Sequence, residues 1–207
     1  MSFDYLFKVI IFGDSAVGKT SLINRYVDNT FFTEVPPTFG VEFKTKDLQN
    51  ERETTRLQLW DTTGQNDCRI PFTSSIYKNA HGILIVFSLI DEKSIQEIEY
   101  FIREIDDYCT DKIEIILVGN KSDLPNQISN VEELVKEHEL SHDFKIFKTS
   151  ALDGSNVSTM FEYLTEQMKL KNPKTQRNIQ KRTDDDDIIK IGGDKVPEIH
   201  KEKRKCC

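Results

Sequence analysis

The stretch GDSAVGKTS, residues 13–21, determines the fold class of this chain. Its glycines Gly13 and Gly18 lie five positions apart and are followed by Lys19 and Thr20, which is the spacing of a phosphate-binding loop. Such a loop points successive backbone N–H groups at an anion, and the next helix turns its positive dipole end toward the same point. The apolar run YLFKVIIF precedes the loop and SLINRYV follows it, so the motif has the strand–loop–helix context that it requires.

Each part of this loop has a predicted contact. Backbone N–H groups would bind phosphate oxygens, Lys19 would reach the β- and γ-phosphates, and the Thr20 hydroxyl would bind Mg²⁺. The predicted phosphate-binding residues of the loop are Ser15, Ala16, Val17, Gly18, Lys19, Thr20 and Ser21. The loop alone distinguishes neither ATP from GTP nor a kinase from a hydrolase.

Composition and charge indicate one globular domain with a charged tail. The 207 residues are 37% hydrophobic and carry a formal net charge of −7, so the total does not favour nucleic acid. Residues 172–207 hold ten Lys/Arg and seven Asp/Glu, whereas residues 1–171 hold 18 and 28. We expect a nucleotide-binding domain over 1–171 and a flexible tail over 172–207, because the tail is rich in charge, Gly and Pro. We expect neither a signal peptide nor a membrane-spanning segment.

Apolar strands alternate with helical stretches along the predicted domain. The strands are expected at 5–12, 41–48, 55–60, 83–89, 113–118 and 144–147, and the helices at 19–27, 67–78, 94–108, 130–140 and 157–170. The second and third strands are joined by the polar turn QNER and should pair antiparallel. The pattern predicts an α/β fold with a doubly wound, mostly parallel six-stranded sheet and one antiparallel edge strand. Ligands should then bind at the carboxyl ends of the strands.

A second motif, LQLWDTTGQ, ends an apolar strand with an acid, a glycine and a glutamine. Asp61 would hold Mg²⁺ through water, and the Gly64 N–H would donate to the γ-phosphate. Gln65 would orient the attacking water, so Gln65 and Lys19 are the predicted catalytic residues. An ordinary polar turn after a strand is the alternative, and the nearby phosphate loop makes it the weaker one.

Two further motifs favour guanine as the base. In NKSD, the carboxylate of Asp123 can accept hydrogen bonds from N1–H and the exocyclic amine of guanine, a donor pair that adenine lacks. Asn120 can meet the opposite edge of the base, and the Lys121 stem can cover the ring. In TSA, the backbone N–H of Ala151 can donate to the guanine O6. The predicted guanine-binding residues are Asn120, Lys121, Asp123, Ser150, Ala151 and Phe31.

The loop VPPTFG supplies the fifth stretch. Its Thr38 could bind Mg²⁺ only while a γ-phosphate is present, and Phe31, seven residues earlier, could pack on the guanine edge. The predicted metal ligands are therefore Thr20, Thr38 and, through water, Asp61.

These five stretches, in this order and spacing, resemble the Ras superfamily of small GTPases, and FGVEFKTK, LQLWDTTGQ, AHGILIVFSLIDEKS and the terminal Cys-Cys look like the Rab family. The resemblance covers residues 5 to about 171 and implies the small G-protein form of the P-loop fold. It implies a monomeric GDP/GTP switch that uses Mg²⁺ and acts in vesicle trafficking. It also implies slow intrinsic GTP hydrolysis, on the order of 10⁻³ to 10⁻⁴ s⁻¹, and γ-phosphate-dependent ordering of residues around 31–42 and 62–79.

The resemblance also implies partners. These are a guanine-nucleotide exchange factor, a GTPase-activating protein, an escort or GDP-dissociation inhibitor, and effectors, with no nucleic acid. Phe43, Trp60 and Tyr77 match the aromatic triad at which Rab-like proteins meet effectors, and packing in the core is the alternative for them.

The terminal Cys206 and Cys207 would carry two geranylgeranyl groups, and two chains anchor a protein stably where one does not. The basic stretch KEKRK would add attraction to an anionic leaflet. An unmodified tail and a metal-binding cysteine pair are the alternatives. The expected location is the cytoplasmic face of intracellular membranes, with a soluble cytosolic pool. The particular membrane and the Rab subfamily do not follow from the sequence.

Several positions depart from the common Rab pattern. Thr63 replaces an alanine, Asn66 replaces a glutamate, and Val35 stands where a tyrosine is frequent. We hypothesise that these changes blunt or redirect the switch chemistry, because Thr63 could crowd Gln65 or accept the phosphoryl group. The alternative function is a catalytically weak, GTP-loaded recruitment platform. A P-loop kinase is weaker still, because no segment is left for an acceptor-binding domain or lid.

Overall fold

The computed structural model describes residues 3–51, 53–64, 74–108, 113–125, 128, 130–137 and 144–173. All of them belong to the first of two units of the chain, Met1–Thr175 and Gln176–Cys207. The strands are β1 (Tyr5–Gly13), β2 (Val41–Gln49), β3 (Thr54–Thr62), β4 (Gly82–Ser88), β5 (Glu114–Asn120) and β6 (Lys145–Lys148). The helices are α1 (Lys19–Asp28), α2 (Ser74–Tyr77), α3 (Glu92–Tyr108), α4 (Val131–Glu137) and α5 (Val157–Lys171). Within the described ranges, no helix has both the length and the apolar character needed to cross a bilayer.

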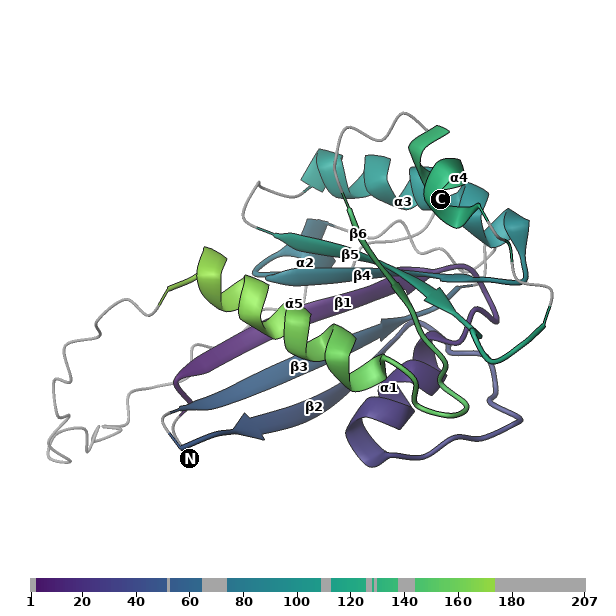
Figure 1. Ribbon diagram of the computed structural model, residues 1–207. Helices are drawn as coiled ribbons and strands as arrows, with labels where there is room; N and C mark the ends of the chain where they lie inside the picture. Colours follow the sequence, from purple (N-terminus) through teal and green to yellow (C-terminus); the bar gives the residue numbers. More distant parts are fainter. Residues whose placement is uncertain are drawn as a thin grey trace, which may run out of the picture. The chain divides into compact units, whose positions relative to one another are not determined.

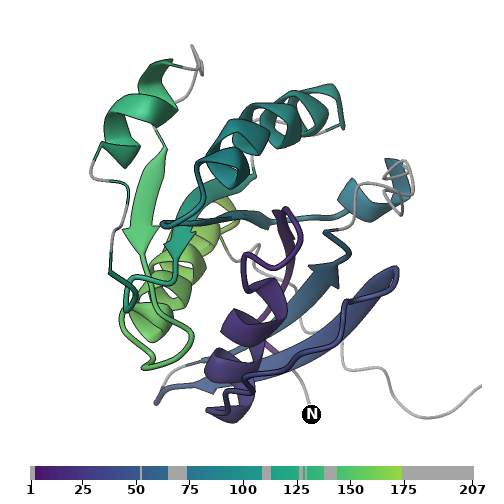
Figure 2. The same ribbon diagram turned by 90° about the vertical axis from the view of Figure 1, so that its right-hand side faces the viewer.

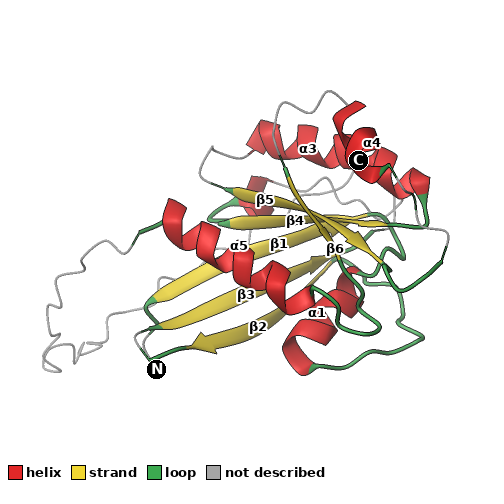
Figure 3. Cartoon of the chain, viewed as in Figure 1, coloured by secondary structure: helices red, strands yellow, loops and turns green. Residues whose placement is uncertain are grey.

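The six strands form one sheet in the order β2-β3-β1-β4-β5-β6, with helices on both of its faces (Figures 1 and 3). Only β2 runs antiparallel to its neighbour, with Val41 opposite Thr62, and the other pairs are parallel. Strand β1 lies between β3 and β4. The chain adds β2 and β3 on one side of β1 and then β4, β5 and β6 on the other, so the strand order reverses at β1. The carboxyl ends of the parallel strands, where this topology binds ligands, face the viewer in Figure 2. The predicted fold class is confirmed.

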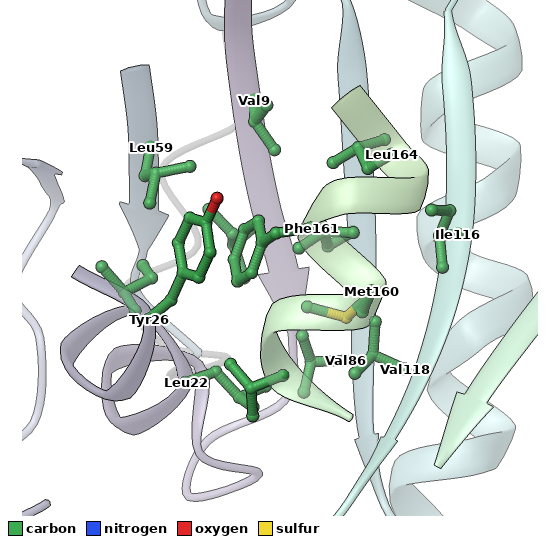
Figure 4. Packing of buried hydrophobic residues seen from close by; sticks show 14 of the residues in the cluster. Val9, Leu22, Tyr26, Leu59, Val86, Ile116, Val118, Met160, Phe161 and Leu164 are labelled. Atoms are coloured by element: carbon green, nitrogen blue, oxygen red, sulfur yellow. The ribbon is translucent and has the colours of Figure 1, made fainter. Parts of the chain in front are cut away.

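Each face of the sheet has its own core. Helices α1 and α5 cover one face, where Tyr26 and Phe161 stack with ring centres 3.9 Å apart (Figure 4). Helices α2, α3 and α4 cover the other face. Strand β4 is buried along its whole length because helices cover it on both sides, which explains its uninterrupted apolar sequence GILIVFS. The apolar residues of α3 that recur at helical spacing are all buried, namely Ile95, Ile98, Phe101, Ile102 and Ile105.

Two elements differ from their predicted bounds in ways that affect the site. Strand β3 continues beyond Trp60 to Thr62, because β2 pairs with it up to the register Val41–Thr62. Asp61 therefore lies within the sheet and not in a turn after it. Of the helix expected at 67–78, the structure describes Ser74–Tyr77 as α2, and residues 65–73 lie outside the described part.

Candidate functional site

A cavity of about 520 Å³ opens at the carboxyl ends of the parallel strands. Its walls are the phosphate loop, the start of α1, the loop before β2, and the loops after β5 and β6. The predicted site residues that line it are Ser15, Ala16, Gly18, Lys19, Thr20, Ser21, Phe31, Thr38, Gly64, Asn120, Lys121, Asp123 and Ala151. Residues of five motifs that lie far apart in the sequence therefore line one cavity.

The backbone of the phosphate loop adopts conformations and close contacts that require glycine at two positions. Gly18 has φ +98°, and a Cβ there would lie 2.4 Å from Nδ2 of Asn120. Gly13 is the last residue of β1, and a Cβ there would lie 2.1 Å from the carbonyl oxygen of Val86 in β4, so a glycine is required where the loop leaves the sheet. Val17, a residue of the loop, is fully buried and does not line the cavity.

Helix α1 begins at Lys19, and no side chain caps its first turn. The first-turn N–H groups and the positive dipole end of a helix favour an anion at this position. The Lys19 side chain is only 6% exposed, and its ammonium donates to the carbonyl oxygens of Gly13 (2.9 Å) and Asp14 (2.8 Å). The cation is thus held over the loop, at the phosphate end of the cavity.

Three oxygen-bearing side chains from three segments meet beside Lys19. The Thr20 hydroxyl donates to Oδ2 of Asp61 at 2.5 Å and lies 3.0 Å from the Thr38 hydroxyl. Asp61 is 4% exposed, burial raises the pKa of its carboxyl group, and its Oδ1 has no hydrogen-bond partner among the described residues. Oxygen ligands of this kind suit Mg²⁺, and an unsatisfied buried carboxylate oxygen fits a site for a cation or its water ligand. Within the described ranges, no group of three or more His, Cys, Asp or Glu side chains is arranged to hold a metal ion.

The other end of the cavity is formed by the loops that follow β5 and β6. Asp123 accepts a 2.6 Å hydrogen bond from the Ser150 hydroxyl, which orients its carboxylate. Lys121 has a left-handed backbone, with φ +66°, and lines the cavity beside it. Phe31 also lines the cavity and packs partly against the core that covers one face of the sheet.

Asn120 is used inside the protein. It is 2% exposed, its Nδ2 donates to the Val17 carbonyl (2.9 Å), and its Oδ1 accepts the N–H of Ala151 (3.2 Å). A buried amide must satisfy both ends, and here the phosphate loop and the loop after β6 do so. These two bonds join two walls of the cavity, and Asn120 also lines it. The predicted contact of Asn120 with the edge of the base stays a prediction.

The segment after Asp61 also approaches the phosphate loop. A Cβ on Gly64 would lie 2.5 Å from the Ser15 nitrogen, so a glycine is required where the two backbones meet. Thr63 is 4% exposed, its N–H donates to the Gly40 carbonyl (2.9 Å), and it is not one of the cavity-lining residues, whereas Val35 is. Gln65, Asn66, Cys206 and Cys207 lie outside the described residues.

The three aromatic residues of the expected effector surface differ in burial. Phe43 is 51% exposed and meets half-buried Trp60 edge to face, with ring centres 5.7 Å apart. Tyr77 is only 4% exposed and stacks on Tyr108 at 5.3 Å. Tyr77 is therefore a core residue, as the alternative expected, because α2 turns it toward α3 and the sheet.

Two charged residues, Lys8 and Arg25, make buried or long-range contacts that the sequence motifs did not predict. Lys8 is 8% exposed, its ammonium donates to the carbonyls of Ile76 (2.5 Å) and Lys78 (3.2 Å), and burial lowers its pKa. Its ammonium also lies 4.3 Å from the centre of the Trp60 ring. A lysine inside the apolar run YLFKVIIF was the available signal for it. Arg25, which contacts the loop after β6, lies in no motif.

Comparison with known proteins agrees with this geometry. Residues 8–170 match the sequence model of the Ras family. The chain is 38% identical over 181 residues to the GTP-binding protein YPT1 of Saccharomyces cerevisiae, covering 87% of this chain and 86% of that protein. It is 38% identical over 167 residues to the Ras-related protein RABD2a of Arabidopsis thaliana, covering 81% and 82%. It is 39% identical over 166 residues to the Ras-related protein Rab-11A of Dictyostelium discoideum, covering 80% and 77%. The chain therefore belongs to the Ras family and, within it, is a Rab-like small GTPase.

Proposed function

We propose that the cavity binds GDP and GTP together with Mg²⁺, and that the protein is a switch that hydrolyses GTP to GDP and phosphate. The observation that carries the proposal is that one cavity joins a phosphate loop to an oriented carboxylate at its far end. A purine nucleotide has this polarity, with its negative charge at one end and its hydrogen-bonding base at the other. The relatives described as GTP-binding proteins support the same assignment.

At the phosphate end, the proposed ligands of the β- and γ-phosphates are the loop N–H groups, the Gly64 N–H and Lys19. The hydroxyls of Thr20 and Thr38 would hold Mg²⁺ directly and Asp61 would hold it through water, since the two hydroxyls and the carboxylate already meet there. Mg²⁺, when bound, neutralises charge on the phosphates. Gln65 is the proposed residue that orients the attacking water.

At the base end, Asp123 is proposed to accept the N1–H and amine hydrogen bonds of guanine, with the Ser150 hydroxyl fixing its carboxylate. The Lys121 stem and Phe31 would cover the ring. The Ala151 N–H is proposed to donate to O6, because an N–H with a 3.2 Å contact to Asn120 can be shared between two acceptors. Asn120 would position both the phosphate loop and this N–H.

The switch is proposed to act in vesicle trafficking at the cytoplasmic face of intracellular membranes, with a soluble pool in the cytosol. Two geranylgeranyl groups on Cys206 and Cys207 would anchor it, and Phe43 with Trp60 would form the exposed part of the effector surface. Its regulators would be an exchange factor, an activating protein that supplies an arginine, and an escort.

The alternative of a catalytically weak platform is not favoured. It relied on Thr63, Asn66 and Val35. Thr63 is not a cavity-lining residue, Val35 is one, and Asn66 lies outside the described residues. The relatives described as GTP-binding proteins favour the hydrolysing switch. Single-turnover hydrolysis of GTP by the wild type and by Thr63→Ala tests the point. Equal rates would reject a role for Thr63 in the chemistry.

Calorimetry with GDP and with ADP, each with Mg²⁺, tests the proposed ligand. We expect tight uptake of GDP and at least about a 10³-fold weaker uptake of ADP, because ADP leaves the Asp123 carboxylate unpaired. Asp123→Ala should remove most of this preference. The matched control Asp106→Ala, an exposed acid on α3, should keep it. Equal binding of ADP and GDP by the wild type would overturn the proposal.

A further inference from the structure

Arg25 links helix α1 to the loop after β6 through its guanidinium group. Its Nε donates to the carbonyl of Ala151 (2.9 Å), and its Nη2 donates to the carbonyl of Leu152 (2.6 Å). Its Nη1 donates to the backbone carbonyl (3.2 Å) and side-chain oxygen (3.0 Å) of Asn29. Two of these bonds belong to the local end of α1, and the other two cross to residues 126 and 127 positions away.

The two long-range bonds hold one side of Ala151. Ala151 is 4% exposed and lines the cavity, and its N–H contacts Oδ1 of Asn120 on the other side. Arg25 fixes the peptide that follows Ala151, and Asn120 fixes the peptide that precedes it. The direction of the Ala151 N–H is therefore set by both side chains.

The same helix also carries the phosphate end of the cavity. Helix α1 begins with Lys19 and Thr20, which line the cavity, and Arg25 lies in its last turn. A helix of ten residues is stiff. Arg25 therefore fixes the position of the loop after β6 relative to the phosphate loop at the other end of α1. A lysine would reproduce this link only in part, since its three donors lie on one nitrogen, whereas the planar guanidinium presents Nε, Nη1 and Nη2 in a fixed fork.

We propose that Arg25 is a positioning residue for base recognition: it holds the Ala151 N–H where that group can donate to the oxygen at position 6 of a 6-oxopurine. The inference rests on the proposed guanine nucleotide site and adds a determinant outside the recognised motifs. A purely structural role, as a cap of α1 through Asn29, would affect all nucleotides alike.

The experiment compares three diphosphates on the full chain with Mg²⁺. GDP and inosine diphosphate both carry O6, whereas 6-thio-GDP carries sulfur, a weak acceptor, at the same position. In Arg25→Met, which keeps the apolar stem, the dissociation constants for GDP and inosine diphosphate should rise about five- to tenfold, as for loss of one neutral hydrogen bond. The constant for 6-thio-GDP should rise less than twofold. The control Arg103→Met, an exposed arginine on α3, should change none of them.

The outcomes separate the inference from the proposed function. Equal losses for all three nucleotides, or no loss, in Arg25→Met would overturn the positioning role while leaving the guanine site intact. Failure of the wild type to prefer GDP over ADP would overturn the site itself. Arg25→Lys keeps the charge and should show a smaller rise of the dissociation constants for GDP and inosine diphosphate, again without a comparable rise for 6-thio-GDP. If Arg25→Met does not fold, Arg25→Lys tests the positioning role in its place.

Discussion

At the residue scale, the buried hydroxyl of Tyr26 lowers the stability of the core. Tyr26 is 9% exposed, its ring stacks on Phe161, and none of the described residues offers its hydroxyl a hydrogen bond (Figure 4). Burial raises the pKa of Tyr26 because the charged phenolate is disfavoured there. An unpartnered buried hydroxyl costs free energy that a phenyl ring does not.

Tyr26→Phe should therefore leave the free energy of unfolding unchanged or raise it by up to about 1 kcal/mol. Urea denaturation of the GDP-loaded protein measures this. The control Tyr100→Phe removes an exposed hydroxyl that donates to Glu104 and should change stability by less than about 0.5 kcal/mol. A loss above about 1 kcal/mol in Tyr26→Phe would mean that its hydroxyl has a partner.

Asp123 offers a second prediction at the residue scale, about the choice of base. An amide presents one donor and one acceptor in place of two acceptors, which suits the C2 carbonyl and N1–H of xanthine. Asp123→Asn should weaken GDP binding by about 100-fold or more and strengthen binding of xanthosine diphosphate. Competition binding with both nucleotides measures the change, and Asp106→Asn is the matched control. Unchanged GDP affinity would remove Asp123 from the base site.

At the scale of elements, Lys8 and His81 join β1 to the segment between α2 and β4. The Lys8 ammonium holds the two carbonyls at the end of α2, and the backbone N–H of Lys8 donates to Nδ1 of His81 (3.1 Å). Burial, and then the nearby charge of Lys8, lower the pKa of His81. The folded protein thus favours the neutral imidazole, whose Nδ1 can accept.

This arrangement predicts a pH dependence of stability. Below the ordinary histidine pKa of about 6.5, the unfolded chain binds a proton at position 81 that the folded protein resists. The contribution of His81 to stability is therefore complete above that pH and is lost as the pH falls. Between pH 7.5 and pH 5.5, the urea midpoint of unfolding should fall more for the wild type than for His81→Gln. Parallel falls in the two proteins would show that His81 is not a source of the pH effect.

At the scale of the whole molecule, a bound nucleotide and Mg²⁺ would tie together walls that come from distant segments. Thr20 belongs to α1, Thr38 to the loop before β2, and Asp61 to β3. A ligand that binds only the folded protein raises its stability in proportion to the logarithm of ligand concentration over Kd. The metal should therefore contribute to the stability of all these walls together.

Removal of Mg²⁺ by EDTA should lower the Tm of the GDP-loaded protein by several degrees and speed GDP release. Thr20→Val lacks the hydroxyl proposed as a metal ligand, so its Tm should respond little to EDTA. The control Thr45→Val, at an exposed position of β2, should keep the full response. The proposed metal site is wrong if Thr20→Val and the wild type respond equally.

The sequence by itself determined the order of strands and helices, the sheet class and the five motifs. These depend on signals that are local along the chain, such as the spacing in GDSAVGKTS and the buried run GILIVFS. Strand continuation was less local, because the extension of β3 to Thr62 depends on pairing with β2.

Only the tertiary structure decided how the pieces are used. Four features depend on partners that are remote in sequence. They are the burial of Tyr77, the internal hydrogen bonds of Asn120, the contacts of the Lys8 ammonium at the end of α2, and the link from Arg25 to Ala151. A side chain's type limits which bonds it can make, but the folded backbone determines which donors and acceptors lie within reach of it.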